Sequence, residues 1–183
     1  MNEVSVDDEL VGVTLDERYR LDAVLGEGGM GRVYRGTQLA VSRRVAVKVL
    51  HKNLARDDTI ANRFLREAEV VSGFSHPNIV NLVDFGTDSD HGVVYLVMEL
   101  LEGRELSSLL SGRRCGPALV VELADQICAA LTEPHDEGVI HRDLKPNNLM
   151  VQTVSDGSVQ AKILDFGIAH VVQAQTRLTE TDA

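Results

Sequence analysis

Positions 141–148 read HRDLKPNN, the most specific string in this chain of 183 residues. An aspartate is followed two positions later by a lysine and five positions later by an asparagine. In this spacing Asp143 can accept a proton from a hydroxyl group, Lys145 can neutralise a phosphoryl group in transfer, and the Asn148 amide can ligate Mg²⁺. The alternative is a polar loop in which aspartate and asparagine serve only as turn formers.

The glycine run at positions 25–33, LGEGGMGRV, offers a place for phosphate groups. Gly26, Gly28 and Gly31 fit the pattern G-x-G-x-x-G, and glycine lets a backbone approach phosphates because it has no Cβ. A dinucleotide-binding domain would place a helix directly after the glycines. Here residues 33–35 continue as a strand, so the glycines are predicted to cap a β-hairpin. A glycine-rich turn without a ligand is the alternative.

A lysine and a glutamate supply candidate charges in the same region. Lys48 in VAVKVL shares one strand face with Ala46. A lysine on a strand usually marks a solvent edge, but the helix expected from residue 60 onward carries Glu67 among its apolar positions. Glu67 is therefore a candidate internal partner for Lys48, and a buried pair makes sense if it holds something negative in place.

A second carboxylate, Asp165, follows the apolar pair Ile163-Leu164 at the end of an expected strand. A carboxylate in a buried position is costly unless it has a positive partner. The position therefore predicts a cationic partner for Asp165.

Composition excludes several classes of protein. A net charge of -10, a pI near 5.0 and an aromatic content of 4% argue against nucleic acid as a partner. No run is long and apolar enough for a membrane segment. Cys115 and Cys128 lack a metal-ligand or redox spacing, so free thiols in a reducing cytoplasm are expected. Residues 1–17 carry six acidic residues and no lysine or arginine, which predicts a disordered acidic leader.

The order of patterns predicts an α+β protein with two lobes. Strand-like runs and one main helix fill residues 18–100, and residues 101–183 are mostly helical. In the second part, short and long helices are expected over Leu106–Leu110 and Leu119–Leu131, and Pro134 is expected to end or kink the long one.

With all these motifs in this order, the chain resembles the eukaryotic-like serine/threonine protein kinases, and LGEGGMGRVYRG is most similar to their bacterial branch. The resemblance extends from Tyr19 to about Thr181. It implies a five-stranded antiparallel N-lobe with one main helix and an incomplete, mainly helical C-lobe. It also implies the use of ATP with Mg²⁺ or Mn²⁺ to phosphorylate serine and threonine in proteins, including the chain itself.

The resemblance assigns roles to individual residues. Asp143 is the base or orients the substrate hydroxyl, Lys145 serves transfer to serine or threonine, and Asn148 and Asp165 hold the metal. Lys48 contacts phosphates and pairs with Glu67. The positions implied in nucleotide binding are Leu25, Gly26, Gly28, Gly31, Val33, Ala46, Lys48, Met98, Glu99, Leu101 and Met150.

Regulation is implied at three further positions. Arg142 resembles the arginine that contacts a phosphorylated activation loop, and Thr179 and Thr181 lie where bacterial relatives autophosphorylate. The alternative for these threonines is an ordinary polar tail. A kinase dimer formed through the N-lobe is a candidate assembly.

The catalytic domain of this family continues past residue 183, so the chain is expected to be truncated within the activation segment. Two function classes follow. The first is a protein kinase. The second is a truncated, non-catalytic module that binds nucleotide or pairs with a complete kinase.

Overall fold

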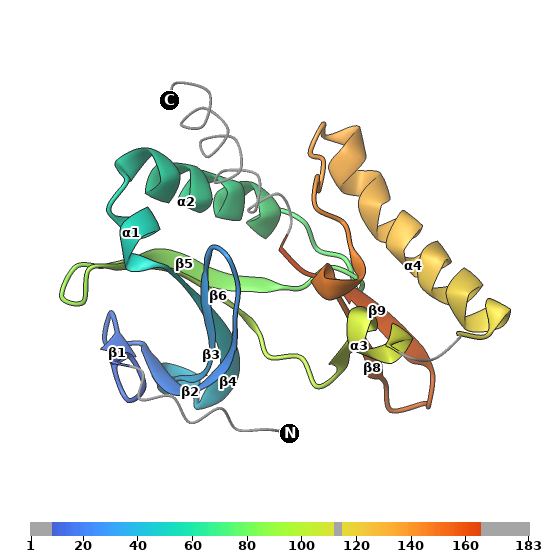
Figure 1. Ribbon diagram of the computed structural model, residues 1–183, viewed down its shortest axis with the longest axis horizontal. Helices are drawn as coiled ribbons and strands as arrows, with labels where there is room; N and C mark the ends of the chain where they lie inside the picture. The colour runs from blue at the N-terminus through green and yellow to red at the C-terminus, as the bar shows by residue number, and fades with distance from the viewer. Residues whose placement is uncertain (1–8, 112–114, 166–183) are drawn as a thin grey trace. The chain divides into compact units, whose positions relative to one another are not determined.

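Antiparallel pairing of strands rich in valine, leucine and tyrosine builds the first of two units, which consists of residues 1–68 and 82–100. The computed structural model describes residues 9–111 and 115–165 (Figure 1). The sheet order is β1-β2-β3-β4-β6-β5, and all neighbouring strands are antiparallel. The strands are β1 (Thr14–Leu15), β2 (Tyr19–Glu27), β3 (Gly31–Gln38), β4 (Arg43–Leu50), β5 (Leu82–Asp88) and β6 (Val93–Glu99), with a 3-10 turn at Leu39–Val41.

The two faces of this sheet carry different side chains. Because side chains alternate along a strand, Val47 and Val49 of β4 point to one face, where they join a buried cluster that includes Tyr95. Ala46 and Lys48 lie on the opposite face, as the sequence predicts. The face with Val47 and Val49 is the core of the unit, and Ala46 and Lys48 on the other face are also buried, at 8% and 7% exposure.

The sixth strand, β1, corrects two predictions. The sequence predicts a five-stranded sheet and a disordered leader over residues 1–17, but Thr14–Leu15 pairs with β2. Leu15 is fully buried, and the backbone N–H of Asp16 donates to the Asp88 carboxylate over 2.7 Å. The number of acidic residues predicts disorder, but it takes no account of the apolar side chains between them, which pack into the core of the first unit. Residues 1–8 lie outside the described part of the chain.

The main helix of this region is α2 (Asp58–Ser72), preceded by the single turn α1 (Lys52–Ala55). The Asp57 carboxylate caps α2, because it accepts the backbone N–H groups of Thr59 and Ile60 over 2.9 and 3.2 Å. The buried side chains of α2 recur at helical spacing, which confirms the predicted helix: Ile60, Phe64, Ala68 and Val71.

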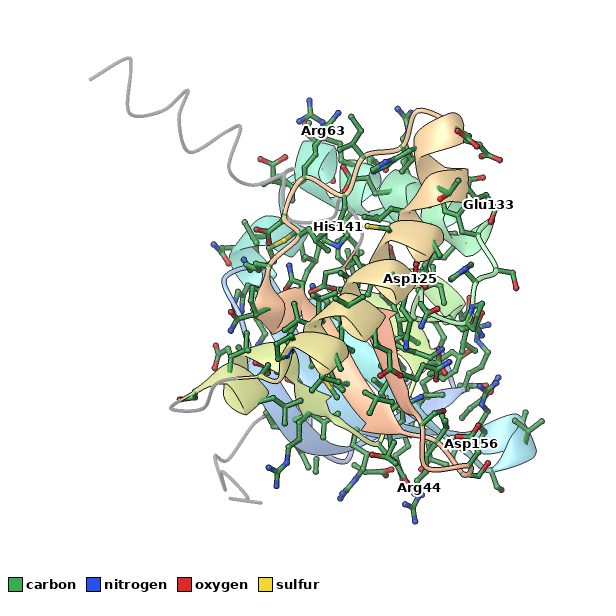
Figure 2. All side chains as sticks on the ribbon, turned by 90° about the vertical axis from the view of Figure 1, so that its right-hand side faces the viewer. Arg44, Arg63, Asp125, Glu133, His141 and Asp156 are labelled. Carbon is green, nitrogen blue, oxygen red and sulfur yellow. The ribbon has the colours of Figure 1, made fainter. Side chains whose placement is uncertain are left out.

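The second unit consists of residues 69–81 and 101–183. Its three-stranded sheet contains β7 (Arg104–Glu105), β8 (Leu149–Thr153) and β9 (Val159–Ile163) in that order. Its helices are α3 (Leu106–Leu110), α4 (Pro117–Asp136) and the 3-10 turn η2 (Pro146–Asn148). Figure 1 shows α4 alongside β9. Exposed charged side chains of α4, among them Asp125 and Glu133, are labelled in Figure 2.

Helix α4 continues for two residues past Pro134 and ends at Asp136, so Pro134 does not itself end the helix. Proline lacks an N–H group, and at this position the loss affects only the last turn, where helical pairing is ending. The Pro134 carbonyl instead accepts the backbone N–H of Val139 over 2.8 Å. No helix in the described part of the chain combines the length and apolar character that crossing a membrane requires.

The sequence predicts that the loop after α2 is part of the first lobe, whereas in the structure it belongs to the second unit. Its backbone pairs with β9: the N–H of Ile163 donates to the Asn78 carbonyl, and the N–H of Val80 donates to the Ile163 carbonyl. The side chain of Asn78 is buried, and its Nδ2 donates to the Ala161 carbonyl over 2.7 Å and to Gln126 Oε1 over 2.8 Å. A single amide therefore connects this loop, α4 and β9.

Replacing Asn78 tests the contribution of this amide. We expect Asn78→Ala to lower the free energy of unfolding by about 1–3 kcal/mol, because the buried Ala161 carbonyl loses its side-chain donor. Urea unfolding followed by circular dichroism measures the change. Asn62→Ala, at an exposed position on α2, is the matched control and is expected to change stability by less than about 0.5 kcal/mol. Equal losses in the two variants would contradict the assigned role.

Candidate active site

Strand register collects several predicted nucleotide-binding residues on one face of the first sheet. Gly26 is paired with Val33, and Val33 is paired with Lys48 across the next pair of strands. Ala46 is paired with Met98. Directly opposed residues on neighbouring strands share a face, and Ala46 and Lys48 share one because they are two positions apart. These five residues therefore occupy the sheet face opposite the valine and tyrosine core.

The glycine run forms a tight turn between β2 and β3, as predicted. Gly28 and Gly31 exchange both backbone hydrogen bonds, at 2.9 and 3.3 Å. Gly26 and Gly28 are exposed, whereas a Cβ on Gly31 would lie 2.1 Å from the Val49 carbonyl oxygen. Gly31 therefore permits the close approach of β3 to β4, and the exposed glycines leave the backbone of the turn accessible to a ligand.

The remaining predicted residues of this unit differ in burial. The side chain of Lys48 is 7% exposed, and Glu67 on α2 is half-buried with its Oε2 atom inside the protein. Leu25 is 50% exposed, and Glu99 is half-buried at the end of β6. Both charged groups are thus largely withdrawn from water, and the pairing of Lys48 with Glu67 stays a prediction.

In the second unit, HRDLKPNN forms a hydrogen-bonded cluster around Asp143. The Lys145 ammonium lies 3.0 and 2.8 Å from the two carboxylate oxygens of Asp143. The Asn148 Nδ2 atom donates to the Asp143 backbone carbonyl over 2.8 Å and to its Oδ2 atom over 3.0 Å. The structure thus brings together the three residues that the sequence assigned to one reaction.

These contacts determine the charge of Asp143. The hydrogen bond from Lys145 holds the pKa of Asp143 below its ordinary value, and the Asn148 amide acts in the same direction while partial burial opposes both. The ionised carboxylate is the form that these donors stabilise. Their contribution is complete above the ordinary pKa of aspartate and is lost as the pH falls through the lowered value.

A buried histidine connects this loop to Asp165. His141, labelled in Figure 2, is 2% exposed, and its Nε2 atom lies 2.8 Å from the Leu164 carbonyl oxygen. A carbonyl oxygen only accepts, so Nε2 donates in this contact, and the backbone N–H of Asp143 lies 3.3 Å from Nδ1 and 2.8 Å from the His141 carbonyl oxygen. The Leu164 N–H donates to the Asn148 carbonyl over 2.8 Å. Leu164 is therefore held on both sides, directly before Asp165.

Two residues at the site have left-handed backbone conformations. The φ angle is +60° at Arg142 and +48° at Asp165. Such angles cost free energy in residues with a Cβ, and they persist where the surrounding bonds determine the geometry. Here those bonds are the ones made by the flanking His141, Asp143 and Leu164.

The donor atoms of the second unit suit a magnesium ion. Because an amide nitrogen is not a metal ligand, Asn148 would use Oδ1, which the two bonds made by Nδ2 orient. Asp165 adds a half-buried carboxylate, and oxygen atoms are the ligands that Mg²⁺ prefers. The residues present therefore fit the implied metal.

The other predicted positions are placed as follows. Leu101 begins the part of the second unit that follows residue 100, and Met150 is half-buried on β8. Thr179 and Thr181 lie outside the described residues. Sequence reasoning missed His51, whose ring contacts the glycine turn, since an isolated histidine without a spacing pattern gives no signal.

Comparison with known proteins identifies the family of this chain. The model of the protein kinase domain matches residues 19–183. The serine/threonine-protein kinase pkn3 of Myxococcus xanthus is 41% identical over 168 residues, which are 91% of this chain and 30% of that protein. The probable serine/threonine-protein kinase PknB of Corynebacterium glutamicum is 42% identical over 173 residues, which are 91% of this chain and 26% of that protein.

The chain thus spans less than a third of the length of these curated relatives. The crystal structure of the Mycobacterium tuberculosis PknI kinase domain matches with a TM-score of 0.74 and 28% identity, covering 86% of this chain and 62% of that one. Motifs, fold and relatives agree, and the chain belongs to the protein kinase family, among bacterial serine/threonine kinases.

Proposed function

We propose that this chain binds ATP with Mg²⁺ or Mn²⁺ and transfers the γ-phosphoryl group to serine and threonine hydroxyls of proteins, including its own. The observation that carries the proposal is the cluster around Asp143, whose carboxylate lies within 3.0 Å of both the Lys145 ammonium and the Asn148 amide nitrogen. In a turn without a catalytic role, Lys145 would not be needed on both oxygens of the Asp143 carboxylate, whose pKa is lowered.

The residues of the first unit serve the nucleotide in this proposal. The backbone of the glycine turn contacts the phosphates, and Lys48, positioned by Glu67, contacts them from β4. The residues proposed for the adenine ring are Leu25, Val33, Ala46, Met98, Glu99, Leu101 and Met150. Three apolar members of this set, Val33, Ala46 and Met98, share a sheet face with Lys48, which supports their assignment.

The residues of the second unit serve the transfer itself. A bound divalent cation supplies positive charge for the phosphate oxygens, and Asn148 and Asp165 hold it. Lys145 neutralises the phosphoryl group in transfer, since electrostatic stabilisation is the main demand of this reaction. Asp143 has a lowered pKa and is therefore a weak base, so it orients the acceptor hydroxyl and takes its proton late, when the oxygen has become acidic.

The proposed partners are proteins with serine or threonine acceptors. Arg142 is proposed to contact a phosphorylated activation segment, with Thr179 and Thr181 as the autophosphorylated residues. A dimer formed through the first unit stays a prediction from the family resemblance.

Nucleotide binding can be tested separately from catalysis. We expect Lys48→Met to weaken binding of a non-hydrolysable ATP analogue at least about tenfold, because a phosphate loses its charged donor. Asn148→Ala and Asp165→Asn are expected to remove the dependence of binding on Mg²⁺. Isothermal titration with and without Mg²⁺ measures both effects.

The control for Lys48 is a second lysine close to it in sequence. Lys52 has a 59% exposed side chain that pairs with Glu9, and Lys52→Met is expected to leave the affinity unchanged. Equal losses in the Lys48 and Lys52 variants would contradict a specific phosphate contact.

Phosphoryl transfer tests the catalytic assignment. With radiolabelled ATP and a mixed protein acceptor, Asp143→Asn is expected to lower the initial rate about 10²–10⁴-fold, because the amide cannot take the proton. The melting temperature and nucleotide affinity of the variant show whether the fold and the ATP site survive. Transfer that persists in Asp143→Asn would contradict the assignment. Binding without transfer by the unaltered chain would favour the non-catalytic nucleotide-binding module.

A further inference from the structure

His51 follows β4 directly and contacts the glycine turn twice. Its backbone N–H donates to the Met30 carbonyl over 3.0 Å, and its Nε2 atom lies 2.9 Å from the Gly28 carbonyl oxygen. A carbonyl oxygen only accepts, so Nε2 carries the proton in this contact. The two bonds hold the residues on either side of Gly29, at the tip of the turn.

Apart from the two backbone bonds between Gly28 and Gly31, the tip has little other support. A Cβ placed on Gly26 or Gly29 would meet no atom within 4 Å, so the side of the backbone to which a side chain would point is open. The ion pair between Arg32 and Glu27 crosses the hairpin over 2.8 Å, but Glu27 is 53% exposed and such pairs contribute little. Glycine also loses the most conformational freedom on ordering. The ring of His51 is thus a side chain that can restrict the turn.

We infer that His51 is a positioning residue that holds the glycine turn ready for nucleotide. The inference rests on the proposed function, in which the backbone of this turn contacts phosphates. A turn that is already ordered loses less conformational entropy when a ligand binds, so the ring bond raises nucleotide affinity without touching the nucleotide. The bond itself exists in the protein without nucleotide, and it can be tested there.

The test compares His51→Leu with His51→Gln in the full chain. The Gln side chain carries an amide N–H at nearly the distance of Nε2, whereas leucine has no donor. Losing one hydrogen bond is expected to speed hydrogen exchange at the backbone amides of Gly28–Gly31 about threefold to tenfold in the Leu variant, and to weaken binding of fluorescently labelled ADP by a similar factor. His51→Gln is expected to restore most of both values.

The control is His135→Leu, at an exposed position on α4 in the other unit, which is expected to change neither exchange nor affinity. Unchanged exchange in His51→Leu would overturn the inference, and so would a Gln variant as fast as the Leu variant. Faster exchange with unchanged ADP affinity would also overturn it, because the turn would then not limit binding. If even the unaltered chain binds no ADP, the proposed function fails, and the exchange rates alone decide whether His51 holds the turn.

Discussion

The bonds on either side of Leu164 are the constraint on which the chemistry of the second unit depends. The His141 ring donates to the carbonyl of Leu164, and the N–H of Leu164 donates to the carbonyl of Asn148, both over 2.8 Å. Leu164 has no reactive group, but it precedes Asp165 and follows β9. Its backbone therefore relates Asp165 to the loop that carries Asp143. The strained φ angle of Asp165 is the local cost of this connection.

The same strand is held from its other side by the loop that follows α2. Backbone bonds at Asn78 and Val80, and the Asn78 amide that reaches Gln126, pair this loop with β9 and α4. Residues 69–81 comprise the end of α2 and the loop after it, and they belong to the second unit, so this segment is part of the support for Asp165. Packing of Val71, Phe74 and Ile79 against Ile163 makes this support apolar as well as hydrogen-bonded.

Patterns with a fixed spacing could be predicted from the sequence, and contacts between distant single residues could not. Helical spacing located α2, strand alternation put Lys48 opposite the valine core, and HRDLKPNN identified a cluster that the structure assembles. The charge of residues 1–17 predicts a disordered leader, but charge alone gives no information on the burial of an apolar residue such as Leu15. The His51 ring contacts a residue 23 positions away, and the Gln126 side chain bonds to a residue 48 positions away. Such contacts follow no regular spacing, so the sequence pattern does not predict them.

The glycine run illustrates how one motif combines two physical demands. Gly31 cannot carry a Cβ because the Val49 backbone would lie 2.1 Å from it, so its role is to let two strands approach. A Cβ on Gly26 would meet nothing within 4 Å, so packing within the chain does not require glycine there. Under the proposed function, the phosphates of a nucleotide are the group that would need the Gly26 backbone bare. Glycine at position 31 is thus required by the fold, whereas glycine at position 26 has a role only in the proposed function.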